Sequence, residues 1–201
     1  MRVSLRNPAR AMDKNKPAIC VFCGSAFGAR PSYALAARTL GGLIAERGYS
    51  LVYGGGAPGL MGETARAVRG GGGDVAGVLP EFLRWIERPP EWEQNLTITP
   101  DLQLRKTRML AMADAFVVLP GGAGTMDEFF EVVSSANLQI LPKPIVVVDT
   151  DGFFAPLQAL MEHIVREGFA KPALLSTYKV VATPEAAMDE ITHALGPLAG
   201  E

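Results

Sequence analysis

Cysteine and histidine are scarce in this 201-residue sequence, which contains two of each. The two cysteines form one C-x-x-C, Cys20 and Cys23, inside an apolar run that is typical of a buried strand. A tetrahedral zinc site needs four ligands, and the two histidines, His163 and His193, lie far along the chain on predicted helices. We therefore expect core thiols in a reduced compartment, with neither a metal nor a redox centre.

The sequence also lacks long hydrophobic runs and an excess of charge of either sign. No apolar run reaches the roughly 18 residues of a membrane-spanning helix. Lys+Arg 19 against Asp+Glu 21 gives a net charge of −2, which predicts no bulk attraction to nucleic acid or to a membrane. Residues 1–16 are basic but lack the apolar segment of a signal peptide. We expect them to form a disordered tail on a cytoplasmic protein.

Glycine, by contrast, is abundant at 22 residues, and glycines follow short apolar runs that alternate with segments of helical period. The runs predict strands over 18–23, 51–53, 75–78, 115–119, 145–148 and 180–182, and the periodic segments predict helices over 33–46, 60–68, 102–113, 126–137 and 153–167 and after Thr183. Continuous apolar strands that alternate with helices predict a parallel sheet covered on both faces. We expect one α/β, doubly wound, Rossmann-like nucleotide-binding domain over residues 17–196. Residues 80–100 look irregular, as in a lid or a partner-facing segment.

The most informative glycine loop precedes the helix predicted over 126–137. Ligands of open parallel sheets bind beyond the carboxyl ends of the strands, and glycines allow the N–H groups of the following helix to face a phosphate. A structural alternative is a capping box made by Thr125 and Glu128, with Asp127 favouring the helix dipole. A cap does not account for the four small residues before Thr125, and we therefore favour a phosphate loop.

A second loop, with Gly54, Gly56 and Gly59, spells G-x-G-x-x-G after the second predicted strand. The dinucleotide fingerprint also requires an acidic residue at the end of the next strand, where this chain has Leu79-Pro80, so an NAD site is disfavoured. No Lys follows the glycines as it does in a P-loop.

A basic cluster lies on the helix predicted over 102–113. Arg105 and Arg108 are three residues apart and share a helix face. Such a cluster is usually a solvated face. This helix, however, leads directly into the strand that carries the phosphate loop, which would bring its cations near a bound anion.

These motifs together resemble a known family. Pro120-Gly121-Gly122-x-Gly124-Thr125-x-x-Glu128 is similar to the PGGxGTxxE signature of the LONELY GUY (LOG) family, the cytokinin riboside 5′-monophosphate phosphoribohydrolases that were formerly labelled lysine decarboxylases. The resemblance runs from Ile19 to about Ile191. It includes Cys23-Gly24-Ser25, Val52-Tyr53-Gly54-Gly55-Gly56 with Gly59-Leu60-Met61-Gly62, and the Arg105-Lys106 pair.

The resemblance implies a hydrolase that cleaves AMP or N6-substituted AMP to the free base and ribose 5-phosphate, without a cofactor or metal. It implies that Arg105 and Glu128 are catalytic and that the protein is a homodimer or larger homo-oligomer. The substrate-binding residues would be Gly24, Ser25, Gly55, Gly56, Glu87, Arg105, Lys106, Gly121, Gly122, Ala123, Gly124, Thr125, Met126, Asp127, Glu128 and Ser134.

Several positions depart from the family pattern. A family histidine is absent from Leu102-Gln103-Leu104-Arg105-Lys106, and Ala123 stands where Tyr is common, which leaves the base preference open. The alternative function is a nucleotide or molybdenum-cofactor carrier of the same superfamily. An anion carrier gains nothing from a carboxylate such as Glu128 beside its phosphate loop. A lysine decarboxylase is least expected, because none of Lys143, Lys171 and Lys179 has the context of a lysine that anchors pyridoxal phosphate.

Overall fold

The computed structural model describes residues 16–93 and 95–196. The predicted disordered tail lies outside the described residues, apart from Lys16. Among the described residues, no helix combines the length and the apolar character needed to cross a membrane.

Seven parallel strands form one sheet in the order β4-β3-β2-β1-β5-β6-β7. The strands are β1 (Ala18–Phe22), β2 (Ser50–Tyr53), β3 (Val75–Pro80), β4 (Leu96–Thr99), β5 (Ala115–Val118), β6 (Ile145–Val148) and β7 (Lys179–Val181). All six strand pairings are parallel. The predicted doubly wound α/β sheet is confirmed.

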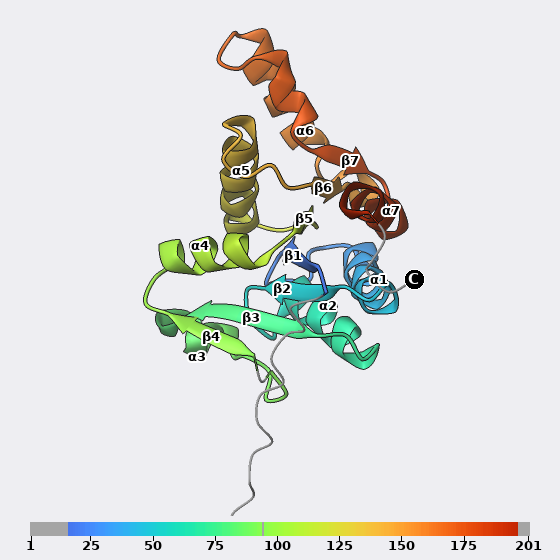
Figure 1. Cartoon of the computed structure of the whole chain (residues 1–201), viewed down its shortest axis with the longest axis vertical. Coiled ribbons are helices and arrows are strands. Elements are labelled where there is room, and N and C mark those ends of the chain that lie inside the picture. The colour runs from blue at the N-terminus through green and yellow to red at the C-terminus, as the bar shows by residue number, and fades with distance from the viewer. Residues whose placement is uncertain (1–15, 94, 197–201) are drawn as a thin grey trace, which may run out of the picture.

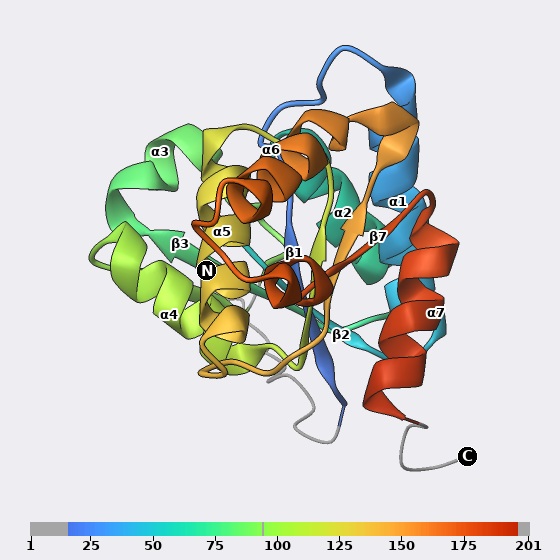
Figure 2. The same cartoon turned by 90° about the horizontal axis from the view of Figure 1, so that it is seen from above.

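Helices cover both faces of the sheet (Figures 1 and 2). They are α1 (Pro31–Glu46), α2 (Gly59–Gly70), α3 (Arg84–Glu87), α4 (Leu102–Met112), α5 (Ala123–Asn137), α6 (Ala155–Arg166) and α7 (Pro184–Leu195). The side chains of β1 alternate between two cores: Ile19 and Val21 pack with α1, α2 and α7, whereas Cys20 and Phe22 pack with α4, α5 and α6. Cys20 is therefore the buried core thiol that the sequence predicts.

The winding direction of the sheet reverses between β1 and β5. The chain moves outward from β1 through β2 and β3 to β4, then returns to β5 beside β1 and continues to β6 and β7. Phe22 and Val118 are paired at the carboxyl ends of β1 and β5. Because the two strands connect to helices on opposite faces, a crevice opens at this switch point, where open α/β sheets bind ligands.

The start of α5 differs from the prediction. The helix begins at Ala123 rather than at 126, and its N-cap is Gly122, which makes no side-chain cap. The capping box of Thr125 and Glu128 is therefore absent. Both residues lie inside the first turns of the helix and are buried. At the start of α7, by contrast, the predicted Thr183 cap is confirmed, since its side chain accepts a hydrogen bond from the N–H of Ala186.

Residues 80–100 contain more regular structure than predicted. A 3₁₀ turn (Glu81–Leu83), α3 and the edge strand β4 lie within them, and β4 pairs with β3 from Gly77↔Leu96 to Pro80↔Thr99. The prediction missed β4 because two of its four residues are threonines and it is only partly buried, so it lacks the continuous apolar run of the central strands.

Candidate active site

A cavity of about 230 Å³ lies at the switch point, and we call it the Glu128 cavity. Its walls come from segments that are far apart in the sequence: the loop after β1, the start of α2, α3, α4 and the start of α5. The lining residues are Cys23, Gly24, Ser25, Met61, Glu87, Arg105, Gly122, Ala123, Gly124, Thr125 and Glu128. The phosphate loop and the basic helix, two of the regions that the sequence singled out, therefore meet at one site.

The loops after β1 and β5 touch directly. The N–H of Gly24 donates to the carbonyl of Pro120 at 3.0 Å, and the Cα of Gly121 lies 3.3 Å from where a Cβ on Gly24 would stand. A Cβ on Gly121 would in turn collide with the side chain of Thr125 and lie 2.8 Å from the N of Gly24. Glycine at 121 is thus required for the two loops to pack together.

The N-terminus of α5 opens into the Glu128 cavity. The first intrahelical bond runs from the N–H of Met126 to the carbonyl of Gly122, so the preceding N–H groups have no acceptor within the helix. Apart from the adjacent residues and the backbone of α5 itself, no atom of the described residues lies within 4 Å of a Cβ built on Gly122 or Gly124. Open space beside unsatisfied N–H groups is the geometry that binds a phosphate or another anion.

Glu128 lies one turn further along α5 and faces Arg105 of α4. The Nη2 of Arg105 is 3.2 Å from the Oε1 of Glu128, and Glu128 is only 7% exposed. Burial raises the pKa of Glu128 to about 7, whereas Arg105 lowers it and the neighbouring Asp127 raises it. Burial thus makes the carboxyl group of Glu128 a weaker acid than an exposed glutamate.

The loop that carries G-x-G-x-x-G makes room for these side chains. A Cβ on Gly54 would collide with the guanidinium of Arg105, and a Cβ on Gly56 would collide with the carboxylate of Glu87. The N–H of Ala57 also donates to the carbonyl of Glu87 at 2.9 Å. The glycines of this loop therefore leave the space that the side chains of Arg105 and Glu87 occupy.

Two buried polar atoms of the cavity residues make no hydrogen bond within residues 16–93 and 95–196. They are the Oε2 of Glu87 and the Nε of Arg105. Burial raises the pKa of Glu87, and Arg105 lowers it. Buried polar groups normally have partners in the protein or in ordered water, and so these two atoms have hydrogen-bonding capacity left for water or a polar ligand.

Lys106 does not line the Glu128 cavity. Its Nζ contacts the Oδ2 of Asp127 at 2.9 Å and the Oε2 of Glu131 at 2.8 Å, and these carboxylates raise the pKa of Lys106. A second cavity adjoins this one, and among the predicted binding residues Gly121 lines only that second cavity. Six predicted binding residues line neither of the two cavities: Gly55, Gly56, Lys106, Met126, Asp127 and Ser134. Their binding roles stay predictions.

Two cavity residues, Cys23 and Met61, were not among the predicted site residues. Both lie in motifs that carry the family resemblance, and their position beside glycines was the only signal that could have identified them. Within the part of the chain that the structure describes, no three His, Cys, Asp or Glu side chains are grouped to hold a metal ion.

Sequence comparison identifies the family. A family model described as "Possible lysine decarboxylase" matches residues 61–191. A probable cytokinin riboside 5′-monophosphate phosphoribohydrolase of Oryza sativa subsp. japonica (LOGL5) is 43% identical over 168 residues, which are 84% of this chain and 68% of the relative. The chain belongs to the LOG family. An Arabidopsis thaliana member of this family, the phosphoribohydrolase LOG7, is 42% identical over 168 residues, which are 84% of this chain and 76% of that protein.

Solved structures with a similar fold are more distant in sequence than these LOG relatives. The molybdenum cofactor binding protein of Rippkaea orientalis has a TM-score of 0.72 at 20% identity, over 92% of this chain and 100% of that one. A Moco carrier protein of Chlamydomonas reinhardtii has a TM-score of 0.66 at 23% identity, over 90% and 98% of the two chains. At these identities the similarity establishes the fold.

Replacing Arg105 with Met should raise the pKa of Glu128 above about 7, because the variant loses the positive charge that favours the carboxylate. An NMR pH titration of ¹³C-labelled glutamate side chains measures this shift, with Glu128→Gln identifying the resonance. Arg108→Met is the matched control, since Arg108 is exposed on the same helix. Equal pKa values for Glu128 in both variants would contradict the coupling between Arg105 and Glu128.

Proposed function

We propose that this LOG-family chain hydrolyses the N-glycosidic bond of AMP or of an N6-substituted (cytokinin riboside) AMP, releasing the base and ribose 5-phosphate. The observation that carries the proposal is the buried pair of Glu128 and Arg105, one helical turn from the open N-terminus of α5. The names of the rice and Arabidopsis relatives support it.

In this proposal the 5′-phosphate binds at the start of α5. The N–H groups from Ala123 onward and the hydroxyl of Thr125 supply donors, and the helix dipole favours the negative charge. The space beside Gly122 and Gly124 admits the phosphate close to the backbone. Binding energy from this remote group holds the ribose against Glu128.

Cleavage of the glycosidic bond develops positive charge on the ribose ring. The base leaves with the bonding electron pair and takes up a proton, and the oxygen of a water molecule adds to the anomeric carbon. The carboxylate of Glu128 stabilises the oxocarbenium-like centre. Arg105 favours the ionised form of Glu128 and has further N–H groups for the nucleotide.

The carrier function is the less supported candidate. A carrier would bind its phosphate without needing a buried carboxylate one turn away, and Glu128 costs free energy because burial raises its pKa. The molybdenum-cofactor proteins named above share only the fold at 20–23% identity.

The proposal also assigns substrate contacts to Ser25 and Glu87, which line the Glu128 cavity, and to Lys106 and Ser134, which do not. A cytoplasmic location is part of it, and the free thiols of Cys20 and Cys23 are compatible with a reducing compartment.

Glu128→Gln should fold with little change in Tm but lose at least about a hundredfold in AMP hydrolysis, because it keeps the shape of the side chain and removes its charge. Single-turnover release of adenine at saturating AMP measures the effect. In the unaltered chain the rate should rise with pH through about 7, as Glu128 loses its proton. Glu162→Gln, an exposed change, is the control. If the rate of Glu128→Gln is within threefold of that of the unaltered chain, Glu128 is not catalytic.

Adenosine should be a far poorer substrate than AMP in kcat/KM. Each charge-assisted hydrogen bond to the phosphate contributes about 1.5–3 kcal/mol, and adenosine forfeits several of them. Parallel assays of adenine release from the two compounds give the ratio. Similar turnover of both would mean that the start of α5 does not hold a phosphate.

We also expect a homodimer or larger homo-oligomer. Large apolar side chains are exposed near Glu87, among them Trp85 at 83%, Ile86 at 68% and Phe82 at 54%, and exposed apolar patches mark interaction surfaces. Light scattering at micromolar concentration should give at least twice the chain mass of 21.4 kDa. A single-chain mass under these conditions would exclude the assembly.

A further inference from the structure

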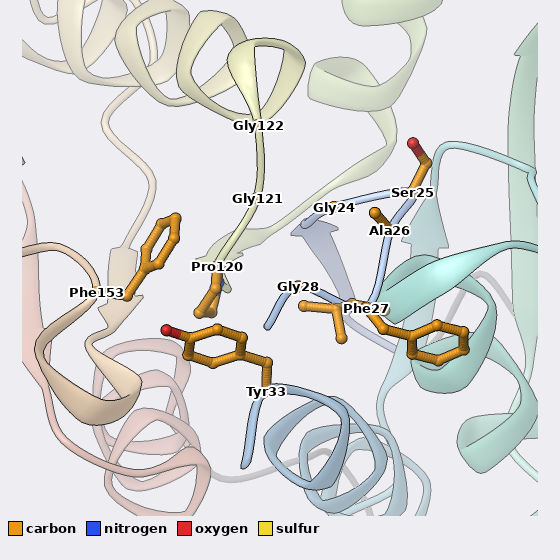
Figure 3. A pocket seen from close by; sticks show the side chains of 11 residues that line it. Gly24, Ser25, Ala26, Phe27, Gly28, Tyr33, Pro120, Gly121, Gly122 and Phe153 are labelled. Carbon is orange, nitrogen blue, oxygen red and sulfur yellow. The ribbon is translucent and has the colours of Figure 1, made fainter. Parts of the chain in front are cut away.

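A second cavity, of about 250 Å³, lies on the other side of the phosphate loop (Figure 3). We call it the aromatic slot. Its lining residues are Gly24, Ser25, Ala26, Phe27, Gly28, Tyr33, Leu60, Pro120, Gly121, Gly122 and Phe153. Gly24, Ser25 and Gly122 line the Glu128 cavity as well. The two cavities therefore share one wall, and that wall includes the N-cap of α5.

The aromatic slot is uncharged and mainly apolar. None of its lining residues is charged, whereas the Glu128 cavity holds Arg105 and two carboxylates. The rings of Tyr33 and Phe153 pack edge to face, with centroids 5.7 Å apart. Walls of this kind fit an uncharged, flat ring better than a phosphate or a sugar.

One polar atom points into the slot. Tyr33 is only 8% exposed, and its hydroxyl makes no hydrogen bond to any residue that the structure describes. Figure 3 shows this hydroxyl on the side of the ring that faces Phe153 and Pro120. This hydroxyl can both donate and accept a hydrogen bond, and it is placed to bond a nitrogen or oxygen atom of a bound ring.

The slot is held open by contacts between its two edges. At the start of α1, the Oγ of Ser32 donates to the Oδ2 of Asp151 at 2.5 Å, and Arg30 donates to the carbonyl of Asp151 at 3.1 Å. Asp151 has a φ of +54°, in the left-handed region. Gly28 has a φ of +71° and would place a Cβ 2.8 Å from the ring of Tyr33. These contacts join the start of α1 to the segment that precedes Phe153, so they link the two edges of the slot.

We propose that the aromatic slot binds a ring carried on the far side of the phosphate, so that the chain takes dinucleotide-type phosphate esters as well as monophosphates. This proposal rests on the proposed function in one respect, which is that the phosphate binds at the start of α5. With the ribose against Glu128 and the phosphate at the shared wall, a group in the slot must be joined through the phosphate. Dinucleotides span the switch point of doubly wound sheets in this way.

Diadenosine 5′,5′-diphosphate tests the inference against AMP. Calorimetric titrations in the Glu128→Gln chain avoid consumption of AMP by Glu128-dependent hydrolysis. The dinucleotide should bind about tenfold more tightly than AMP, the factor that one base stacked on aromatic side chains contributes. Equal affinities would overturn the proposal.

Substitutions at the slot locate the effect. Ala26→Trp places a bulky ring in the slot from an exposed position and should abolish the tenfold difference without weakening AMP binding. Ala29→Trp, on the same exposed loop but outside the slot, should retain the difference. Tyr33→Phe keeps the packing of the ring and should reduce the affinity difference severalfold. This second variant keeps the test valid if the Trp variant misfolds.

Two results would overturn the assignment. One is a dinucleotide advantage that survives Ala26→Trp. The other is a loss of affinity in Ala26→Trp for N6-benzyl-AMP but not for the dinucleotide, which would place the substituent of the base in the slot. Failure of the unaltered chain to hydrolyse AMP would overturn only the proposed function, because the affinity ratio requires no turnover.

Discussion

The site depends on the contact between the loops that follow β1 and β5. The hydrogen bond from the N–H of Gly24 to the carbonyl of Pro120 joins two strands whose helices cover opposite faces. Gly121 has no room for a side chain at this contact. Because the loops touch, α5 begins directly beside β1, and its N-terminus separates the Glu128 cavity from the aromatic slot. The position of both cavities therefore follows from one close backbone approach.

Burial and charge are balanced around Glu128. Removing this carboxyl group from water favours its neutral form, and the guanidinium of Arg105 partly restores the ionised form. The glycine at 54 is what allows Arg105 to reach this position. The loop with the sequence G-x-G-x-x-G thus affects the pKa of Glu128 indirectly, because its glycine leaves space for Arg105.

Much of the fold and of the site could be predicted from the sequence, and the exceptions have physical reasons. Buried parallel strands are continuous apolar runs, which made the central strands visible, whereas β4 is half-exposed and was missed. The start of α5 was misplaced because Thr125 and Glu128 match a cap pattern, although Gly122 is the N-cap. Arg105 and Glu128 were paired by resemblance. The orientation of Lys106 toward Asp127 and Glu131 depends on how α4 packs on α5, which no local pattern encodes.

Thr125 and Glu128 lie on the same helix, α5, so the helix backbone fixes the spacing between them. Three residues of α-helix rise about 4.5 Å, and side-chain changes elsewhere in the cavity leave that rise unchanged. Under the proposed function, hydrogen-bonded backbone therefore sets the distance between the phosphate and the carboxylate. Substitutions elsewhere in the cavity could then change which base is accepted while the spacing for the sugar phosphate stays the same.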